Sequence, residues 1–142
     1  MRLEEVVNCA PITLQHIDGG ANGSLTVAEY GGALPFEFRR VYYMTGVTAP
    51  GAVRGRHAHK TLEQALFCLN GSVRLDVDDG MHKASLVLDK PNEGVYLGPL
   101  LWHELRDFSP GCVVLVFAAA EHDESDYLRD YDGFLAYVKA SP

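Results

Sequence analysis

The sequence predicts an all-β sandwich or barrel that ends in a single α-helix. Candidate strands of about five to eight residues are separated by turn signals about every 8–12 residues, a spacing typical of antiparallel sandwiches and barrels. Asn-Gly at 70–71 and Asp-Gly at 79–80 are tight-turn signals, and residues 73–77 between them alternate between apolar and polar. Only the C-terminal stretch has helical spacing, with apolar residues at i, i+1, i+4, i+7, i+8 and i+11 from Tyr127.

Each expected strand is a run of β-forming residues between two turn signals. In chain order, these runs cover residues 11–17, 24–30, 39–45, 63–69, 73–77, 85–88, 94–97, 101–108 and 112–119. The runs at 63–69 and 112–119 are apolar at nearly every position, which predicts buried strands. The helix is expected over about residues 124–139, with Asp123 or Ser125 as its cap and its tyrosines as packing residues.

Length and composition predict one globular domain over residues 1–142. Hydrophobic residues make up 47% and charged residues 22%, which is ordinary for a globular protein. The formal net charge of −7 disfavours nucleic acid and anionic membranes as partners. The odd number of cysteines, 3, favours reduced thiols and a cytoplasmic location. An acidic N-terminus is unlike a signal peptide, and the longest apolar run, 112–120, is too short to span a bilayer.

The segment Arg54-Gly-Arg-His-Ala-His59-Lys60 carries the strongest chemical signal in the chain. In a strand, His57 and His59 would leave the same face roughly 7 Å apart, so both imidazoles would point into one cavity. An accidental His-x-His on a surface strand is the competing interpretation. The cluster of Arg54, Arg56 and Lys60 in an acidic protein argues against it and predicts a site for an anionic ligand.

A set of motifs in a fixed order resembles one enzyme family. The motifs are Arg-Gly-x-His-Ala-His-Lys-x-Leu-Glu-Gln, Asn-Gly-Ser, Asp-Asp-Gly, Gly-Pro-x-x-Trp-His-Glu and Asp-Glu-x-Asp-Tyr-x-Arg-x-Tyr-Asp-x-Phe. Together they resemble the dTDP-4-dehydro-6-deoxyglucose 3,4-ketoisomerases, which are small cupins, and the resemblance runs from about Arg39 to Phe134. It implies a cupin-type jelly roll (a double-stranded β-helix), a homodimer, no metal or other cofactor, and a dTDP-linked keto sugar as substrate.

The resemblance also implies roles for individual residues. His57 and His59 would be the acid–base residues that move a carbonyl between C4 and C3 through an enediol, since histidine exchanges protons near neutral pH. Arg54 would stabilise negative charge on oxygen or hold the diphosphate, and the sequence leaves both roles open. The full set of expected substrate-binding residues is Arg54, Arg40, Tyr42, Gln64, Trp102 and His103. Arg40 and Tyr42, which share a strand face, suit a pyrimidine nucleotide, although core packing of the tyrosine is a comparable interpretation.

Two other functions compete with an isomerase. His57, His59, Glu63 and His103 have the order of a three-histidine, one-glutamate cupin metal site. Against a metal enzyme, His103 follows Pro99 one residue sooner than in the common Pro-x-Gly-x-x-His motif. The third interpretation is a noncatalytic cupin that binds a nucleotide sugar without turnover.

The first loop departs from the family pattern. Family members tend to carry an arginine before the glycine in this loop, near the sugar, whereas residues 18–23 here read Asp-Gly-Gly-Ala-Asn-Gly. A second departure is Glu121-His122, where an aromatic residue is commoner. A free-energy difference of about 1.4 kcal/mol between two transition states changes the product ratio tenfold. The loss of one contact is therefore enough to change the face on which C4 is protonated. We therefore expect residues 20–22 to influence the product configuration, which the sequence does not determine.

Overall fold

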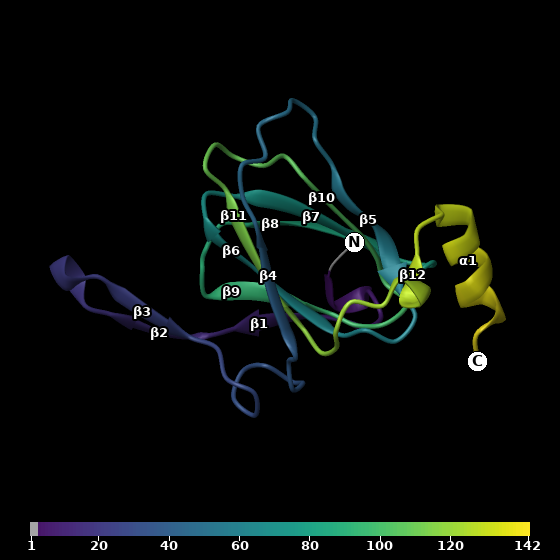
Figure 1. Ribbon diagram of the computed structural model, residues 1–142, viewed down its shortest axis with the longest axis horizontal. Helices are drawn as coiled ribbons and strands as arrows, with labels where there is room; N and C mark the ends of the chain where they lie inside the picture. Colours follow the sequence, from purple (N-terminus) through teal and green to yellow (C-terminus); the bar gives the residue numbers. More distant parts are fainter. Residues whose placement is uncertain (1–2) are drawn as a thin grey trace.

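Two five-stranded antiparallel sheets face one another and form the body of the protein. The computed structural model describes residues 3–142. The sheet orders are β1-β9-β6-β11-β4 and β12-β5-β10-β7-β8, which gives the expected jelly roll (Figure 1). The strands are β1 (Cys9–Thr13), β2 (Gln15–Asp18), β3 (Ser24–Val27), β4 (Arg40–Met44), β5 (Arg54–His59), β6 (Gln64–Asn70), β7 (Val73–Asp78), β8 (Lys83–Leu88), β9 (Glu93–Leu97), β10 (Trp102–Arg106), β11 (Val113–Ala118) and β12 (Tyr127–Leu128). The all-β prediction with one C-terminal helix is confirmed.

The main core fills the space between the two sheets. Strand β7 shows the underlying pattern, because Val73, Leu75 and Val77 point inward and are buried while Arg74 faces outward. Strands β6 and β11 are buried more completely, as their continuous apolar runs predicted. A second apolar cluster covers the other face of β6 and β11. There Leu34 and Phe36, from the chain that leads into β4, pack together with Phe67 of β6.

The C-terminal helix α1 (Tyr131–Ala140) is shorter than expected, and the prediction that it begins near residue 124 is wrong. Glu124–Asp126 form a short 3-10 turn (η3), and Tyr127–Leu128 form β12, which pairs with β5. Asp130 then caps α1 by accepting a hydrogen bond of 2.9 Å from the N–H of Gly133. Tyr127 and Leu128 fit the helical spacing, but backbone pairing with a strand far away in sequence takes precedence over that local pattern.

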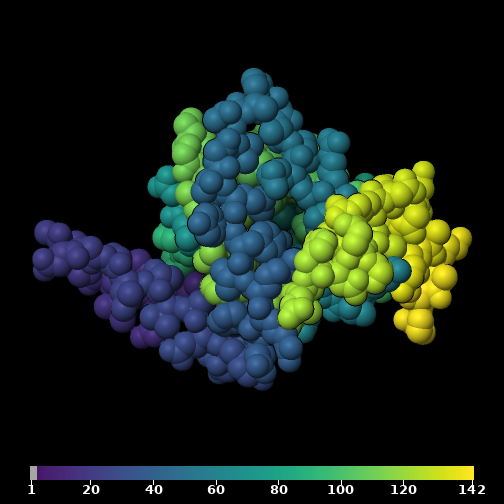
Figure 2. Space-filling model, in the orientation of Figure 1, coloured from purple at the N-terminus to yellow at the C-terminus, as the bar shows by residue number. Residues whose placement is uncertain are grey.

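A hairpin of β2 and β3 extends from the body as a separate two-stranded arm. Figures 1 and 2 show it projecting on the side opposite to β12 and α1. The strand expected over residues 11–17 is thus divided between β1 in the body and β2 in the arm. The tip of the arm consists of residues 18–23, which include a 3-10 turn (η2) at Gly20–Asn22. Within one chain this loop therefore lies away from the two-sheet body (Figure 1).

Two further expectations concern cysteines and membrane spans. Within residues 3–142, Cys9, Cys68 and Cys112 are all free thiols, although the sulfurs of Cys68 and Cys112 lie 3.7 Å apart. In the described part of the chain, no helix has both the length and the apolar character needed to cross a bilayer.

Candidate active site

A cavity of about 330 Å³ opens beside the histidine-bearing strand β5. Its walls come from β4, β5, β6 and β10, and the segment that follows η3 closes one side. In Figure 2 the surface is hollowed between the blue β4–β5 region and the yellow-green segment that leads to α1. The inner faces of both sheets and a C-terminal segment therefore contribute to one site.

A bulge in β5 sets which side chains face this cavity. His103 of β10 pairs with His57, but the next residue, Glu104, pairs with Gly55, so Arg56 is the extra residue. Gly55 and Arg56 both have positive φ, at 86° and 58°. A Cβ at Gly55 would lie 2.9 Å from the carbonyl oxygen of His103, so only glycine fits there. The bulge brings Arg54 to the same cavity as His57, although strict alternation would place them on opposite faces.

Three histidines form the centre of the site. The His57 ring centroid lies 4.8 Å from that of His59 and 4.7 Å from that of His103. His57 and His103 line the cavity, whereas His59 lies behind them and is only 3% exposed. The ring of Tyr127 contacts His57 at 4.9 Å and His59 at 4.4 Å. The two histidines predicted from the His-x-His motif are thus packed together, but only one of them reaches the cavity wall.

Burial keeps these imidazoles neutral at pH 7. It lowers the pKa of His57, and a hydrogen bond with the Gly55 carbonyl opposes this only in part. Burial and the adjacent His57 lower the pKa of His59 to about 3. Burial, with His57 and His59 as neighbours, also lowers the pKa of His103 to about 3. Neutral imidazoles can accept protons, and an anion in the cavity would favour their charged forms.

Guanidinium groups give the cavity a cationic wall. Arg40 lies over the ring of Tyr42 at 5.3 Å, and among the described residues its buried Nε has no hydrogen-bond partner. Gln64 donates a hydrogen bond of 2.8 Å to the Tyr42 hydroxyl, which holds both side chains at the cavity. Arg54 contacts the sulfur of Met44 through Nε at 3.1 Å, so its terminal nitrogens are the donors left for a ligand. This arrangement suits a phosphate or diphosphate group.

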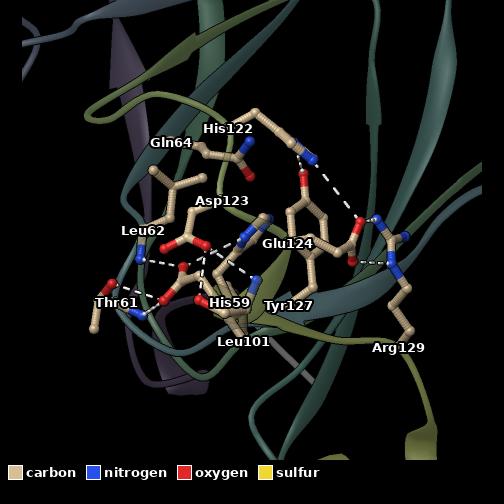
Figure 3. A network of polar contacts seen from close by, with 12 residues as sticks. His59, Thr61, Leu62, Gln64, Leu101, His122, Asp123, Glu124, Tyr127 and Arg129 are labelled. Carbon is tan, nitrogen blue, oxygen red and sulfur yellow. Dashed lines mark hydrogen bonds and ion pairs between the residues drawn. The ribbon is translucent and has the colours of Figure 1, made fainter.

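Two cavity residues, Tyr127 and Arg129, were missed as site residues. The guanidinium of Arg129 lies 4.1 Å from the Tyr127 ring centroid and makes two hydrogen bonds to Glu124, of 2.7 and 2.9 Å. Figure 3 shows this pair beside Tyr127, whose hydroxyl contacts His122 at 3.4 Å. The interpretation of these tyrosines as helix packing residues is therefore wrong for Tyr127. The Asp-Tyr-x-Arg part of the last family motif was the signal that could have identified both residues.

Trp102 does not line this cavity, and its assignment to substrate binding stays a prediction. Consecutive residues of a strand face opposite sides, and His103 and Leu105 are the residues of β10 that line the cavity. The Trp102 indole donates a hydrogen bond of 2.9 Å to Glu104 on the outer side. It packs against Phe134 of α1 with ring centroids 5.7 Å apart. Its function is to attach the helix to the sheet.

The four-ligand metal set is not assembled. Ligand atoms of His57, His59 and His103 all lie within 4.8 Å of one another, a separation that one metal ion could bridge. Glu63, the expected fourth ligand, instead accepts a hydrogen bond of 2.7 Å from the hydroxyl of Tyr96. Glu63 is not part of the histidine group, so only the three imidazoles of the expected ligand set lie together among the described residues.

The chain is similar in sequence and in fold to several known proteins. The family model described as "FdtA: WxcM-like, C-terminal" matches residues 7–139. A TDP-4-oxo-6-deoxy-alpha-D-glucose-3,4-oxoisomerase from Aneurinibacillus thermoaerophilus is 48% identical over 118 residues, which are 83% of this chain and 84% of the relative. An asparagine-for-histidine mutant of the 3,4-ketoisomerase QdtA from Thermoanaerobacterium thermosaccharolyticum, solved with TDP-4-keto-6-deoxyglucose, has a TM-score of 0.90 at 40% identity, covering 94% and 96% of the two chains. The TDP-quinovose 3,4-ketoisomerase WlaRB from Campylobacter jejuni has a TM-score of 0.85 at 39% identity, with 92% and 99% covered.

Proposed function

Since the chain belongs to the FdtA family of sugar-nucleotide 3,4-ketoisomerases, we propose that it converts a dTDP-4-keto-6-deoxyhexose into the 3-keto isomer. The observation that carries this proposal is a cluster of three imidazoles, two of which line a cavity that also has guanidinium groups on its walls. A related enzyme solved with TDP-4-keto-6-deoxyglucose supports the same class of substrate. We assign the function to a single cupin domain, and the three free thiols support a cytoplasmic location.

The reaction moves two protons without any net oxidation. A base removes the proton from C3, the electron pair forms the C3=C4 bond, and the former C4 carbonyl oxygen accepts a proton to give the enediol. The C3 hydroxyl then loses its proton, the C3 carbonyl forms, and C4 takes up a proton. His57 at the cavity wall and His59 behind it are the proposed acid–base pair, since neutral imidazole can accept a proton and then return it.

The cationic wall has a separate role in the proposal. Arg54 shares the cavity with His57, so its guanidinium can stabilise negative charge that develops on the enediol oxygens. Arg40 and Arg129 can neutralise the diphosphate, and Tyr42 with Gln64 can contact the nucleotide or sugar. Bound anionic substrate would also raise the pKa values of the buried histidines toward the range useful for proton transfer.

Substitution of each histidine tests the proposed chemistry. We expect His57→Asn and His59→Asn each to lower turnover of TDP-4-keto-6-deoxyglucose by about 10²–10⁴-fold, while TDP affinity stays within about threefold. The matched control is His82→Asn in the β7–β8 turn, far from the cavity in the sheet order, which should keep wild-type turnover. Wild-type turnover in either test variant would remove that histidine from the mechanism.

Metal analysis separates the isomerase from the two alternatives. Turnover that persists in chelator, with no metal in the purified protein, would exclude a metal enzyme built on His57, His59 and His103. Loss of turnover in chelator with recovery on adding Zn²⁺, Fe²⁺ or Mn²⁺ would replace our proposal with that alternative. Tight nucleotide-sugar binding without turnover under all conditions would favour the noncatalytic cupin.

We also propose that the protein acts as a homodimer in which the β2–β3 arm contacts the second subunit. Two observations support it: the arm exposes apolar side chains, with Ile17 48% and Leu25 60% exposed, and β4 is an open edge strand. Light scattering at micromolar concentration should give twice the chain mass. The double variant Ile17→Asp/Leu25→Asp should shift it toward the monomer, and a monomeric wild type would refute the proposal.

A further inference from the structure

A carboxylate lies directly behind the buried histidine of the candidate site. The side chain of His59 is 3% exposed, and neither of its ring nitrogens has a hydrogen-bond partner among residues 3–142. Asp126 Oδ2 lies 3.7 Å from His59 Nδ1, which is too long for a hydrogen bond but close enough for an ion pair once the imidazole is protonated. Asp126 is the second aspartate of the Asp-Glu-x-Asp-Tyr-x-Arg motif.

Four hydrogen bonds donated by residues 60–62 hold Asp126 at this place. Its Oδ1 accepts hydrogen bonds from the Thr61 N–H at 3.0 Å and from the Thr61 hydroxyl at 2.7 Å, and its Oδ2 accepts one from the Leu62 N–H at 3.1 Å. Its backbone carbonyl accepts a further bond of 2.8 Å from the Lys60 N–H. The carboxylate is therefore fixed beside β5 by two backbone N–H groups and one hydroxyl.

The next residue of the same segment strengthens this link. Tyr127 pairs with His59 in the β12–β5 ladder, and its ring covers the imidazole at 4.4 Å. The turn η3 and strand β12 thus place a carboxylate at one edge of the imidazole and an aromatic ring over it. His59 is the movable partner in this group because its ring has no hydrogen bond to hold its orientation.

Resting on the function proposed above, we propose that Asp126 is the positioning residue of His59: it accepts the Nδ1 hydrogen and so leaves Nε2 free for proton transfer. A ring shift of roughly 0.8 Å would shorten the 3.7 Å separation to a normal hydrogen bond. The same contact stabilises the imidazolium that forms when Nε2 accepts a proton. Asp126 touches no reacting atom and acts through His59 alone.

This role matters because a neutral imidazole can carry its single hydrogen on either nitrogen. Without a partner, a buried histidine populates both tautomers, and the one with hydrogen on Nε2 cannot accept a proton there. A carboxylate on Nδ1 selects the useful tautomer and opposes the burial cost of the charged form. In hydrolases that use the same device, removing the carboxylate while keeping the geometry lowers kcat by about 10⁴-fold.

The test uses Asp126→Asn, with Thr61→Val as the matched control. Thr61→Val removes one hydrogen bond to the same carboxylate but keeps the charge beside His59. We expect Asp126→Asn to lower kcat with TDP-4-keto-6-deoxyglucose by about 10²-fold or more while KM changes less than about threefold, and Thr61→Val to keep kcat within about threefold. If the asparagine variant does not fold, Asp126→Ser provides the charge-free comparison.

A spectroscopic readout separates positioning from simple anchoring of the loop. In ¹⁵N-histidine NMR of the TDP complex, we expect His59 to carry its hydrogen on Nδ1 in the wild type and in Thr61→Val, and to lose that preference in Asp126→Asn. An unchanged His59 tautomer in Asp126→Asn, or an equal loss of kcat in both variants, would overturn the proposal. Because the NMR signal requires no turnover, an inactive wild type would refute the isomerase function while leaving the positioning test intact.

Discussion

Replacing His103 should reduce the sensitivity of this fold to acid. His103 is buried beside His57 and His59, and it has a pKa of about 3 in the folded protein against an ordinary value of 6.5. Its Nδ1 lies 3.2 Å from the Leu101 carbonyl oxygen. In His103→Gln, the side-chain amide keeps a donor for that carbonyl but cannot titrate. The variant therefore removes the proton-binding difference between the folded and unfolded states at this position.

The magnitude follows from the two pKa values. A depressed folded pKa means that the unfolded chain binds the proton first, so stability is complete above pH 6.5 and falls as the pH drops toward 3. Between pH 7.5 and 5.0, one such histidine removes about 2 kcal/mol of unfolding free energy. The wild type should therefore lose about 2 kcal/mol more than His103→Gln over this interval.

Urea unfolding without nucleotide, at several values between pH 7.5 and 5.0, measures this difference directly. The comparison uses the slope of unfolding free energy against pH, so a uniform loss of stability from repacking does not affect it. The matched control is His16→Gln, at an exposed histidine of the arm, which should keep the wild-type slope. Parallel profiles for His103→Gln and the wild type would show that a buried neutral His103 does not control acid stability, and would refute the reasoning.

Three further predictions concern the arm, the site cover and a buried acid. Burial raises the pKa of Asp79, but backbone N–H donors, that of Val7 foremost, lower it below the ordinary 3.8. Asp79→Asn should therefore lower the free energy of unfolding in urea at pH 7 by about 1–3 kcal/mol. This loss should become smaller as the pH falls through about 3.8. Tyr127→Ala should lower kcat at least about tenfold by uncovering His59, whereas Tyr127→Phe, which keeps the ring, should stay within about threefold; equal losses would contradict this. Ala21→Arg should change the C4 configuration of the product by NMR more than the rate of deuterium wash-in at C3, and a collapsed C3 exchange with unchanged configuration would show that the tip serves binding or catalysis. Because the tip projects away from the two-sheet body that holds the cavity, this last effect requires a second subunit.

Local patterns in the sequence were sufficient for the fold class and for the centre of the site. Alternation along 73–77 predicted which side chains of β7 enter the core, because a strand has a period of two wherever it lies. The same rule placed Arg40 and Tyr42 on one face of β4, and both line the cavity. The His-x-His spacing predicted that His57 and His59 would lie together, and their rings are 4.8 Å apart. Each of these predictions depends on a repeat that the backbone imposes within a few residues.

Only the tertiary structure decided the rest of the site, because contacts between distant segments overrode the local repeat. The bulge at Arg56 brings Arg54 to the cavity against strict alternation, and it exists through pairing with β10. Pairing of β12 with β5 removes Tyr127 from the expected helix and places its ring over the histidines. Trp102 lies on the outward side of β10, where it packs against Phe134 of α1 and so buries the apolar face of the helix. Which register and which partner an element adopts depends on apolar surface buried against residues far away in the chain, and no periodicity within the element contains that information.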